Sequence, residues 1–175
     1  MMRALVLITL LLISMTSRAQ SDFVRSYDKE NGSLVFKGQV NFDTLKTEAS
    51  FEWLKKGAEA YSPDKETLRF LQEKLPAFDL VIFMGTWCED SHVLLPKLYK
   101  TLQSANYPLS QCNMYGVDRA KTTKYVEHQL YQIAFVPTII LTKKNQEIGR
   151  IVENVKQSIE ADLADLIRND KTSKP

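Results

Sequence analysis

The sequence predicts an α/β fold with one central mixed β-sheet flanked by helices. Residues 80–84 form a continuous apolar run without alternation, which is typical of a strand buried on both faces. A helical segment separates this run from a short strand at 113–117, so we expect these two strands to be parallel. Two strand-like runs on either side of residues 143–146 predict an antiparallel hairpin. At 175 residues the chain is long enough for one domain with a full core.

Residues 1–19 have the composition of a signal peptide. A short basic start that ends at Arg3 precedes an apolar run over 4–15, and Ser17 and Ala19 supply small residues where signal peptidase cuts. The run is shorter than the about 20 apolar residues that a membrane-spanning helix needs. Because no cysteine lies near the cut, we expect cleavage after Ala19, no membrane anchor, and a periplasmic or secreted protein.

The excess of basic residues in the chain lies in this leader. The chain has 23 Lys and Arg against 21 Asp and Glu, and two of the basic residues, Arg3 and Arg18, fall within residues 1–19. The remaining chain is therefore balanced, and its acidic and basic residues are interleaved as on an ordinary solvated surface. This charge distribution gives no support to a nucleic-acid or anionic-membrane partner.

Residues 20–33 are polar and are predicted to form a flexible N-terminus, and residues 34–168 are predicted to form the domain. We expect a strand at 34–40, followed by a helix whose apolar residues recur at helical spacing: Phe51, Leu54, Ala58 and Tyr61. The strand, together with this helix between Asp43 and Tyr61, forms an N-terminal extension. Ser62 and Pro63 predict the N-cap and first position of the next helix, which Pro76 ends.

A further helix is predicted from 88 to 102, with Leu94 or Leu95, Leu98 and Leu102 facing inward and a bend at Pro96. A short helix over 123–131 precedes the hairpin, whose strands are expected at 137–141 and 147–152. The last helix has a regular apolar face, and residues 169–175 are expected to be a disordered tail. That face consists of Ile159, Leu163, Leu166 and Ile167.

The strand–turn–helix segment over residues 84–92 carries the candidate chemistry. Cys88 is predicted at the N-terminus of the helix, where unpaired backbone N–H groups and the helix dipole favour an anion. The thiolate is the nucleophilic form of cysteine. Cys88 is therefore the candidate catalytic residue.

Four features agree in order and spacing with a known protein family. An apolar strand enters Trp87-Cys88, Pro96 follows eight residues after the cysteine, Val136-Pro137-Thr138 forms a loop, and Gly149 lies in the last strand. On these features the chain resembles thioredoxin-like proteins, especially exported bacterial ones, over residues 80–167.

The resemblance implies a thioredoxin-like fold and a cis peptide bond before Pro137. It also implies that Trp87, Val136 and Pro137 bind the substrate, with the Val136 backbone offering hydrogen bonds to an extended peptide beside Cys88. The alternative is that Pro137 is only a proline at the entry of a strand. The expected partners are protein or peptide thiols and disulfides, together with an external thiol reductant.

Two positions depart from the family pattern. The family's usual motif is Cys-x-x-Cys, and Ser91 stands here in the place of the second cysteine. Without that thiol, a mixed disulfide at Cys88 cannot be released by its own neighbour. Ile82 occupies the position of a buried acidic residue and cannot assist proton transfer. Both departures argue against ordinary dithiol reduction and favour a monothiol site made of Cys88 and Ser91.

Three further residues are candidate modulators of this cysteine. Glu89 and Asp90 oppose a thiolate beside them, although acidic residues in a first helical turn also complement the helix dipole. His92 either exchanges a proton with the thiolate or is an exposed spectator, and we expect the spectator. His128 has no motif around it and is expected at the surface.

Cys112 is not expected to pair with Cys88. Cys88 follows the carboxyl end of one strand and Cys112 precedes the amino end of its parallel neighbour, which places them roughly 15 Å apart. A disulfide needs Cα atoms within about 7 Å. We therefore expect Cys112 to be a half-buried small residue, with an intermolecular disulfide as the alternative.

Other cysteine chemistries fit the sequence less well. A phosphatase-type loop needs an arginine six residues after the cysteine, where Leu94 stands. Two cysteines and two scattered histidines do not supply the ligands of a zinc site. No glycine-rich phosphate loop is present, so we expect neither a metal nor a cofactor.

The sequence leaves three functions open. The first is an enzyme-like, monothiol thiol-disulfide oxidoreductase that acts through Cys88. The second is a peptide-binding or client-retention module in which Cys88 captures its clients covalently. The third is a thioredoxin-like domain without a redox cycle.

Overall fold

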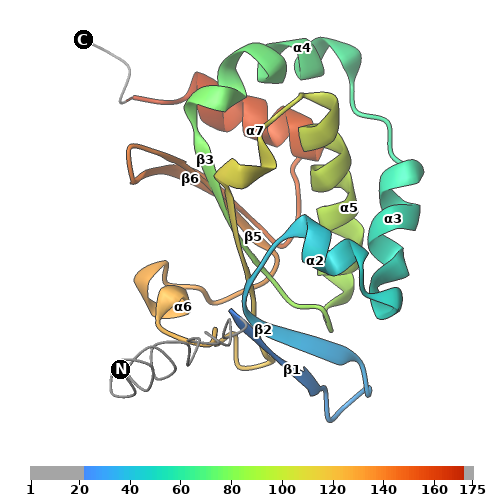
Figure 1. The fold of residues 1–175 in the computed structure, drawn as a ribbon. Helices are drawn as coiled ribbons and strands as arrows, with labels where there is room; N and C mark the ends of the chain where they lie inside the picture. The colour runs from blue at the N-terminus through green and yellow to red at the C-terminus, as the bar shows by residue number, and fades with distance from the viewer. Residues whose placement is uncertain (1–21, 172–175) are drawn as a thin grey trace, which may run out of the picture.

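The computed structural model describes residues 22–171, which form one six-stranded mixed sheet in the order β1-β2-β4-β3-β5-β6 (Figure 1). The strands are β1 (Phe23–Tyr27), β2 (Leu34–Val40), β3 (Asp79–Met84), β4 (Cys112–Gly116), β5 (Thr138–Lys143) and β6 (Gln146–Val152). The helices are α2 (Phe42–Lys46), α3 (Glu52–Glu59), α4 (Lys65–Lys74), α5 (Glu89–Ser104), α6 (Glu127–Leu130) and α7 (Ile159–Arg168). Short 3-10 turns lie at Ala49–Phe51, Leu75–Ala77 and Leu109–Gln111. The predicted α/β class and mixed sheet are confirmed.

Two strand pairings of the sheet, β3–β4 and β5–β6, are those that the sequence pattern predicts. β3 and β4 are parallel and are joined through α5, with Leu80 opposite Cys112. β5 pairs antiparallel with both β3 and β6. The β5–β6 turn is made by Lys144 and Asn145, both at positive φ, the conformation that a tight hairpin turn requires.

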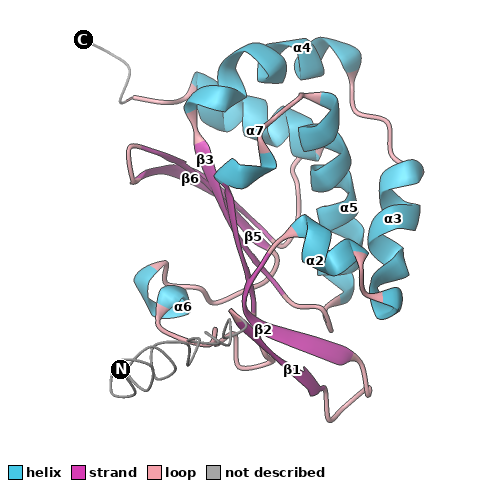
Figure 2. Ribbon diagram, in the orientation of Figure 1, coloured by secondary structure: helices cyan, strands magenta, loops and turns pink. Residues whose placement is uncertain are grey.

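The two faces of the sheet are covered unequally (Figure 2). Helices α2, α3, α4, α5 and α7 lie on one face, and among residues 22–171 the single-turn α6 is the helix on the other. β3 shows why both faces are apolar: Leu80, Ile82 and Met84 belong to the large core, whereas Val81 and Phe83 belong to a smaller cluster on the α6 side. Cys88 is a member of this smaller cluster.

The N-terminal part of the described chain departs from the prediction. Residues 20–33 were expected to be flexible, but Phe23–Tyr27 form β1 and pair antiparallel with β2. β1 is an edge strand whose side chains are mostly exposed, so no apolar alternation marks it. The helix expected between Asp43 and Tyr61 is divided into α2, which is capped by Asn41, a 3-10 turn and α3.

One helix boundary also differs from the prediction. α4 begins at Lys65 and is capped by Asp64, whose side chain accepts a hydrogen bond from the Thr67 N–H at 2.8 Å, and Ser62 is not the cap. An Asp carboxylate placed three residues before a free N–H serves as a cap as well as a Ser hydroxyl does. Pro76 lies in the 3-10 turn that follows the helix, as expected for its end.

Helix α5 contains Pro96, which is buried, and α3 packs against it. A Cβ added to Gly57 of α3 would lie 2.7 Å from the Pro96 Cβ, so the two helices approach closely at this pair.

Two predictions fall on residues that the structure does not describe. The signal peptide over 1–19 lies outside the described residues, as does the end of the tail at 172–175. In the described part of the chain, no helix is both long enough and apolar enough to cross a bilayer.

Candidate functional site

Cys88 is the N-cap of α5 and follows directly from the turn after β3. Its N–H donates to the Gly85 carbonyl at 3.0 Å, and its own carbonyl accepts the first helical bond from the His92 N–H at 3.1 Å. The residue is 9% exposed. Cys88 therefore sits at the helix start predicted from the sequence and is nearly buried.

The loop before β5 meets this cysteine. The Cys88 thiol donates to the Val136 carbonyl, with 3.4 Å between Sγ and O. The Val136–Pro137 peptide bond is cis. The Pro137 carbonyl accepts from the Glu153 N–H at 2.8 Å, and the Thr138 hydroxyl donates to the Phe135 carbonyl at 2.7 Å. The fold thus brings Cys88 together with Val136, which lies 48 residues away in the chain, and with Pro137. Hydrogen bonds on either side of the proline hold this loop in place.

Ser91 lies inside the protein beneath the turn. Its side chain is fully buried, and its Oγ accepts a hydrogen bond from the Gly85 N–H at 3.2 Å. The hydroxyl therefore holds the turn that carries Cys88.

Trp87 forms the side of the site that faces β4. Its indole N–H donates to the Val117 carbonyl at 2.8 Å. The Arg119 guanidinium lies 4.7 Å from the ring centroid, and the Lys121 ammonium lies 5.7 Å from it. Such contacts between a cation and an aromatic face stabilise the position of the ring. Neither cation was singled out from the sequence, because no local motif marks them.

Thr86 ties the turn to the N-terminal extension. Its hydroxyl donates to the Leu34 carbonyl at 2.8 Å and accepts from the Phe36 N–H at 3.1 Å. Thr86 is 1% exposed, so both bonds are shielded from water. Strand β2 is therefore bonded directly to the loop that precedes Cys88.

The structure corrects the expectation for His92. Instead of being an exposed spectator, His92 is half-buried, with its Nε2 2.8 Å from the Thr86 carbonyl oxygen. Its ring stacks on Trp53 of α3 at 4.3 Å between centroids and 23° between planes. The imidazole is thus engaged by the turn and by α3, which a sequence pattern confined to α5 does not reveal.

The other predicted side chains have different surroundings. Glu89 and Asp90 are exposed in the first turn of α5. His128 was expected at the surface, but it is half-buried, and its Nδ1 lies 2.9 Å from the Thr123 hydroxyl and accepts from the Thr123 N–H at 3.2 Å. It caps a turn before α6 and takes no part in the Cys88 site.

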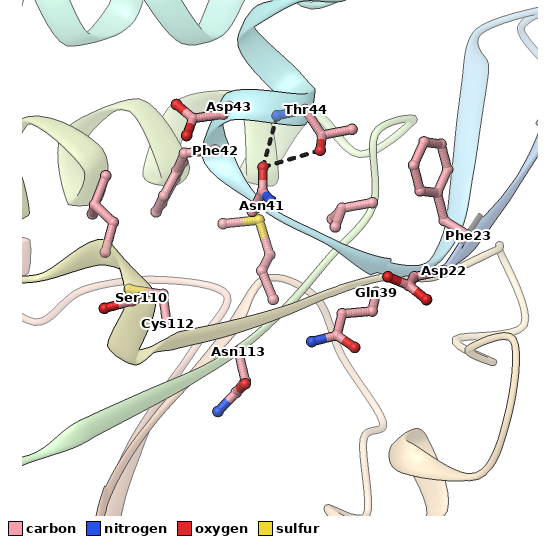
Figure 3. Close-up of a pocket in the computed structure, with 13 residues that line it drawn as sticks. Asp22, Phe23, Gln39, Asn41, Phe42, Asp43, Thr44, Ser110, Cys112 and Asn113 are labelled. Carbon is pink, nitrogen blue, oxygen red and sulfur yellow. Dashed lines mark hydrogen bonds between the residues drawn. The ribbon is translucent and has the colours of Figure 1, made fainter. Parts of the chain in front are cut away.

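Cys112 lies at the opposite end of the β3–β4 pair from Cys88. Both cysteines are free thiols, as expected. Burial raises the pKa of Cys112 to about 12. Cys112 lines a cavity of about 650 Å³ with Asn41, Phe42 and Asn113 (Figure 3). Among residues 22–171, no group of three or more His, Cys, Asp or Glu side chains is placed to hold a metal ion.

Comparison with known proteins identifies the family. The thioredoxin family model matches residues 69–167, which is more than half of the chain. The chain belongs to the thioredoxin family. The match begins after β1, β2, α2 and α3, so these elements are additions in front of the family's segment. A search of curated proteins returned no match.

Three solved structures are similar to this chain at low sequence identity. A protein of unknown function from Pseudomonas aeruginosa is 14% identical, with 75% of this chain and 84% of that chain covered and a TM-score of 0.50. An HIV epitope scaffold is 15% identical, covering 66% and 73% of the two chains with a TM-score of 0.49. Mitochondrial thioredoxin 3 from Saccharomyces cerevisiae, in its oxidized form, is 18% identical, covering 65% and 98% with a TM-score of 0.38. Of these three, the Pseudomonas aeruginosa protein has a TM-score of 0.50, and at 14% identity its likeness concerns the fold alone.

Proposed function

We propose that this thioredoxin-family protein carries out thiol–disulfide exchange through Cys88 alone. One observation carries the proposal: the Cys88 thiol, at the start of α5, contacts the Val136 carbonyl beside the cis Val136–Pro137 bond. This arrangement puts a nucleophile next to a backbone segment that can align an extended peptide. Trp87 packs against the apolar cluster that contains Cys88 and Val136.

The proposed reaction has two exchange steps. In the first, the Cys88 thiolate attacks one sulfur of a substrate disulfide, forms a mixed disulfide with it, and expels the other sulfur as a thiolate that takes a proton from solvent. In the second, the thiolate of an external thiol attacks the substrate sulfur of the mixed disulfide. This step regenerates the Cys88 thiolate and releases the substrate sulfur in a new disulfide with the external thiol. Electrons are conserved because one S–S bond is broken and one is made in each step.

Ser91 explains why an external thiol is required. In the position where the family usually has its second cysteine, this chain has a hydroxyl that is fully buried and accepts from the Gly85 N–H. A hydroxyl cannot attack a disulfide, so the mixed disulfide at Cys88 persists until a thiol arrives from outside.

The same observation favours a second candidate, a client-retention module. If external thiols reach the mixed disulfide slowly, Cys88 holds a client protein covalently instead of turning it over. The two candidates differ in the lifetime of one intermediate and share every residue of the site.

Turnover measured with a small aromatic disulfide and glutathione as the thiol donor separates the candidates. The parent protein, Cys88→Ser and the matched variant Cys112→Ser are compared, with adducts followed by intact mass. We expect repeated turnover in the parent and in Cys112→Ser, and none above background in Cys88→Ser. A single stable adduct at Cys88 instead establishes the retention module. Reactivity at Cys88 no greater than that of a free cysteine refutes both.

We further propose that the protein acts outside the cytoplasm, on protein or peptide thiols and disulfides. The support is the leader pattern of residues 1–19, with its basic start, apolar run and small residues at 17 and 19. Fractionation of cells that produce the full chain, followed by sequencing of the N-terminus, tests this. Recovery of an uncleaved chain in the cytoplasm contradicts it.

A further inference from the structure

An ion pair between a buried carboxylate and a partly exposed guanidinium joins the β1–β2 turn to the loop after β4. Arg119 donates to both carboxylate oxygens of Asp28, from Nε at 2.8 Å and from a terminal nitrogen at 3.1 Å. Its other terminal nitrogen lies 2.9 Å from Glu30. The Asp28 side chain is 5% exposed and also accepts the N–H groups of Glu30 and Asn31 at 3.0 Å each. Such a bidentate pair fixes both the position and the plane of the guanidinium.

The guanidinium held in this way lies over Trp87, the residue before Cys88. The distance from the Arg119 Cζ to the ring centroid is 4.7 Å. The pKa of Arg119 is raised, chiefly by the hydrogen bond to Asp28, and the charge on Cys88 is among the further causes. The same bond is the chief cause that lowers the pKa of Asp28 to about 2. The ion pair thus holds a positive charge over the ring of the residue that precedes Cys88.

Other charged or titratable groups surround the same loop. Glu89 and Asp90 are exposed on α5, and His92 of that helix is engaged by Thr86 and Trp53. Lys121 lies over Trp87 at 5.7 Å, and Glu153 follows β6, with its N–H bonded to the Pro137 carbonyl. Arg119 differs from the other cation, Lys121, in being held by two carboxylates. A fixed charge loses less of its effect to solvent and to side-chain motion than a free one does.

We propose that Arg119 is a positioning residue that stabilises the Cys88 thiolate, and that Asp28 of the β1–β2 turn orients it. The N-terminal hairpin, which precedes the segment matched by the family model, then contributes to the reactivity of the cysteine. The assignment deepens the proposed exchange function and rests on it for its role in catalysis. The stabilisation itself is a property of the thiol that does not require turnover.

The test is the pH profile of Cys88 alkylation by iodoacetamide, followed by peptide mass spectrometry on the full chain. The neutral reagent is not steered by charge. We expect Arg119→Gln to move the midpoint of the profile upward by about 1 pH unit, because an opposite charge close to an acid shifts its titration by about this much or more. At a pH below both midpoints, alkylation then slows about tenfold. Arg119→Lys keeps the positive charge but loses the two parallel hydrogen bonds to Asp28. We expect its midpoint to lie close to that of the parent.

Arg25→Gln is the matched control. Arg25 of β1 also lies over an aromatic ring, 5.0 Å from that of Phe36, and pairs with the Glu48 carboxylate, so its loss also loosens the hairpin. We expect its midpoint to equal that of the parent. An equal shift in Arg25→Gln and Arg119→Gln, or a change in the plateau rate without a change in midpoint, overturns the proposal and leaves Arg119 a purely structural residue.

Glu30→Gln is expected to shift the midpoint of the alkylation profile in the opposite direction. Because Glu30 is largely exposed, we expect this variant to fold. The Glu30 side chain is 68% exposed and neutralises part of the Arg119 charge. Its removal is expected to lower the midpoint by a few tenths of a unit, since exposed pairs are weak. An unchanged or raised midpoint contradicts the proposal. If Cys88 fails to turn over disulfides while these shifts are observed, the exchange function fails and the assignment of Arg119 stands.

Discussion

Cys88 and Cys112 lie at opposite ends of the same parallel strand pair and have opposite surroundings. Cys88 caps α5 and contacts the Val136 carbonyl, with Arg119 over the neighbouring Trp87 ring. Cys112 begins β4 opposite Leu80, and burial alone raises its pKa. The two thiols therefore differ in their polar neighbours: a helix start and a backbone carbonyl accompany Cys88, whereas desolvation is the cause that raises the pKa of Cys112.

The largest expected effect is a difference in labelling between the two thiols. Because burial disfavours the thiolate of Cys112 and raises its pKa to about 12, only about one molecule in ten thousand carries that thiolate at pH 8. We expect iodoacetamide to modify Cys88 at pH 8 long before Cys112, and labelling of Cys112 to rise only as the pH approaches 12. In denaturant the two should react alike. Equal labelling of the two cysteines in the native protein would contradict the predicted difference.

Two threonine hydroxyls, one near each end of β3, allow the anchoring of these two ends to be compared. Thr86→Val leaves the Leu34 carbonyl and the Phe36 N–H without their partner, and we expect a loss of about 2–3 kcal/mol in the free energy of unfolding. At the other end, Thr142 makes one longer bond, 3.3 Å to the Asp79 carbonyl, so Thr142→Val should cost about 1 kcal/mol. Urea unfolding measures both. Equal losses would show that the turn before Cys88 is not specially anchored.

Ser91→Cys tests whether the absence of a second thiol at position 91 alone prevents the release of a mixed disulfide from Cys88. The new thiol would attack a mixed disulfide at Cys88 from within the chain, and we expect release of the adduct to become about tenfold faster or more and independent of external thiol. Ser104→Cys, at the far end of α5, is the control and should leave release unchanged. Persistence of the adduct in Ser91→Cys would show that position 91 cannot reach the mixed disulfide.

The smallest effect concerns pH and the hairpin near Cys88. The folded-state pKa of Asp28 is about 2, below its ordinary value of 3.8, chiefly because of the hydrogen bond to Arg119. A lowered pKa means that the carboxylate stabilises the fold above about pH 4 and that this contribution disappears as the pH falls toward 2. Thermal unfolding of Asp28→Asn should therefore show a lower melting temperature at pH 7 and a smaller further loss between pH 4 and 2. A parallel loss in variant and parent would contradict this.

Continuous apolar runs and turn signals were enough to predict the central strands and the helix start at Cys88, whereas the Val136–Pro137 loop beside it was expected from the family resemblance. β3, β4 and the β5–β6 hairpin follow from local patterns, and Cys88 at a helix start follows from strand, turn and helix in sequence. The edge strand β1 was not predicted because its mostly exposed side chains give no periodic apolar pattern.

Contacts between distant segments could not be predicted. His92 was misjudged because its partner in stacking, Trp53, lies on another helix. Arg119 was overlooked because its carboxylate partner is 91 residues away in the chain. Local spacing reports the face of an element and not the side chain that another element brings to it.

The close approach of Gly57 to Pro96 has a consequence for how this chain can vary. Pro96 lies inside α5, and a Cβ at position 57 would lie 2.7 Å from the Pro96 Cβ, so glycine at 57 allows this approach of α3. Any larger residue at 57 collides with the pyrrolidine ring, so the two positions are free to change only as a pair. Relatives that keep the proline and possess α3 should carry glycine at its counterpart, and those that lose the helix should be released from that constraint.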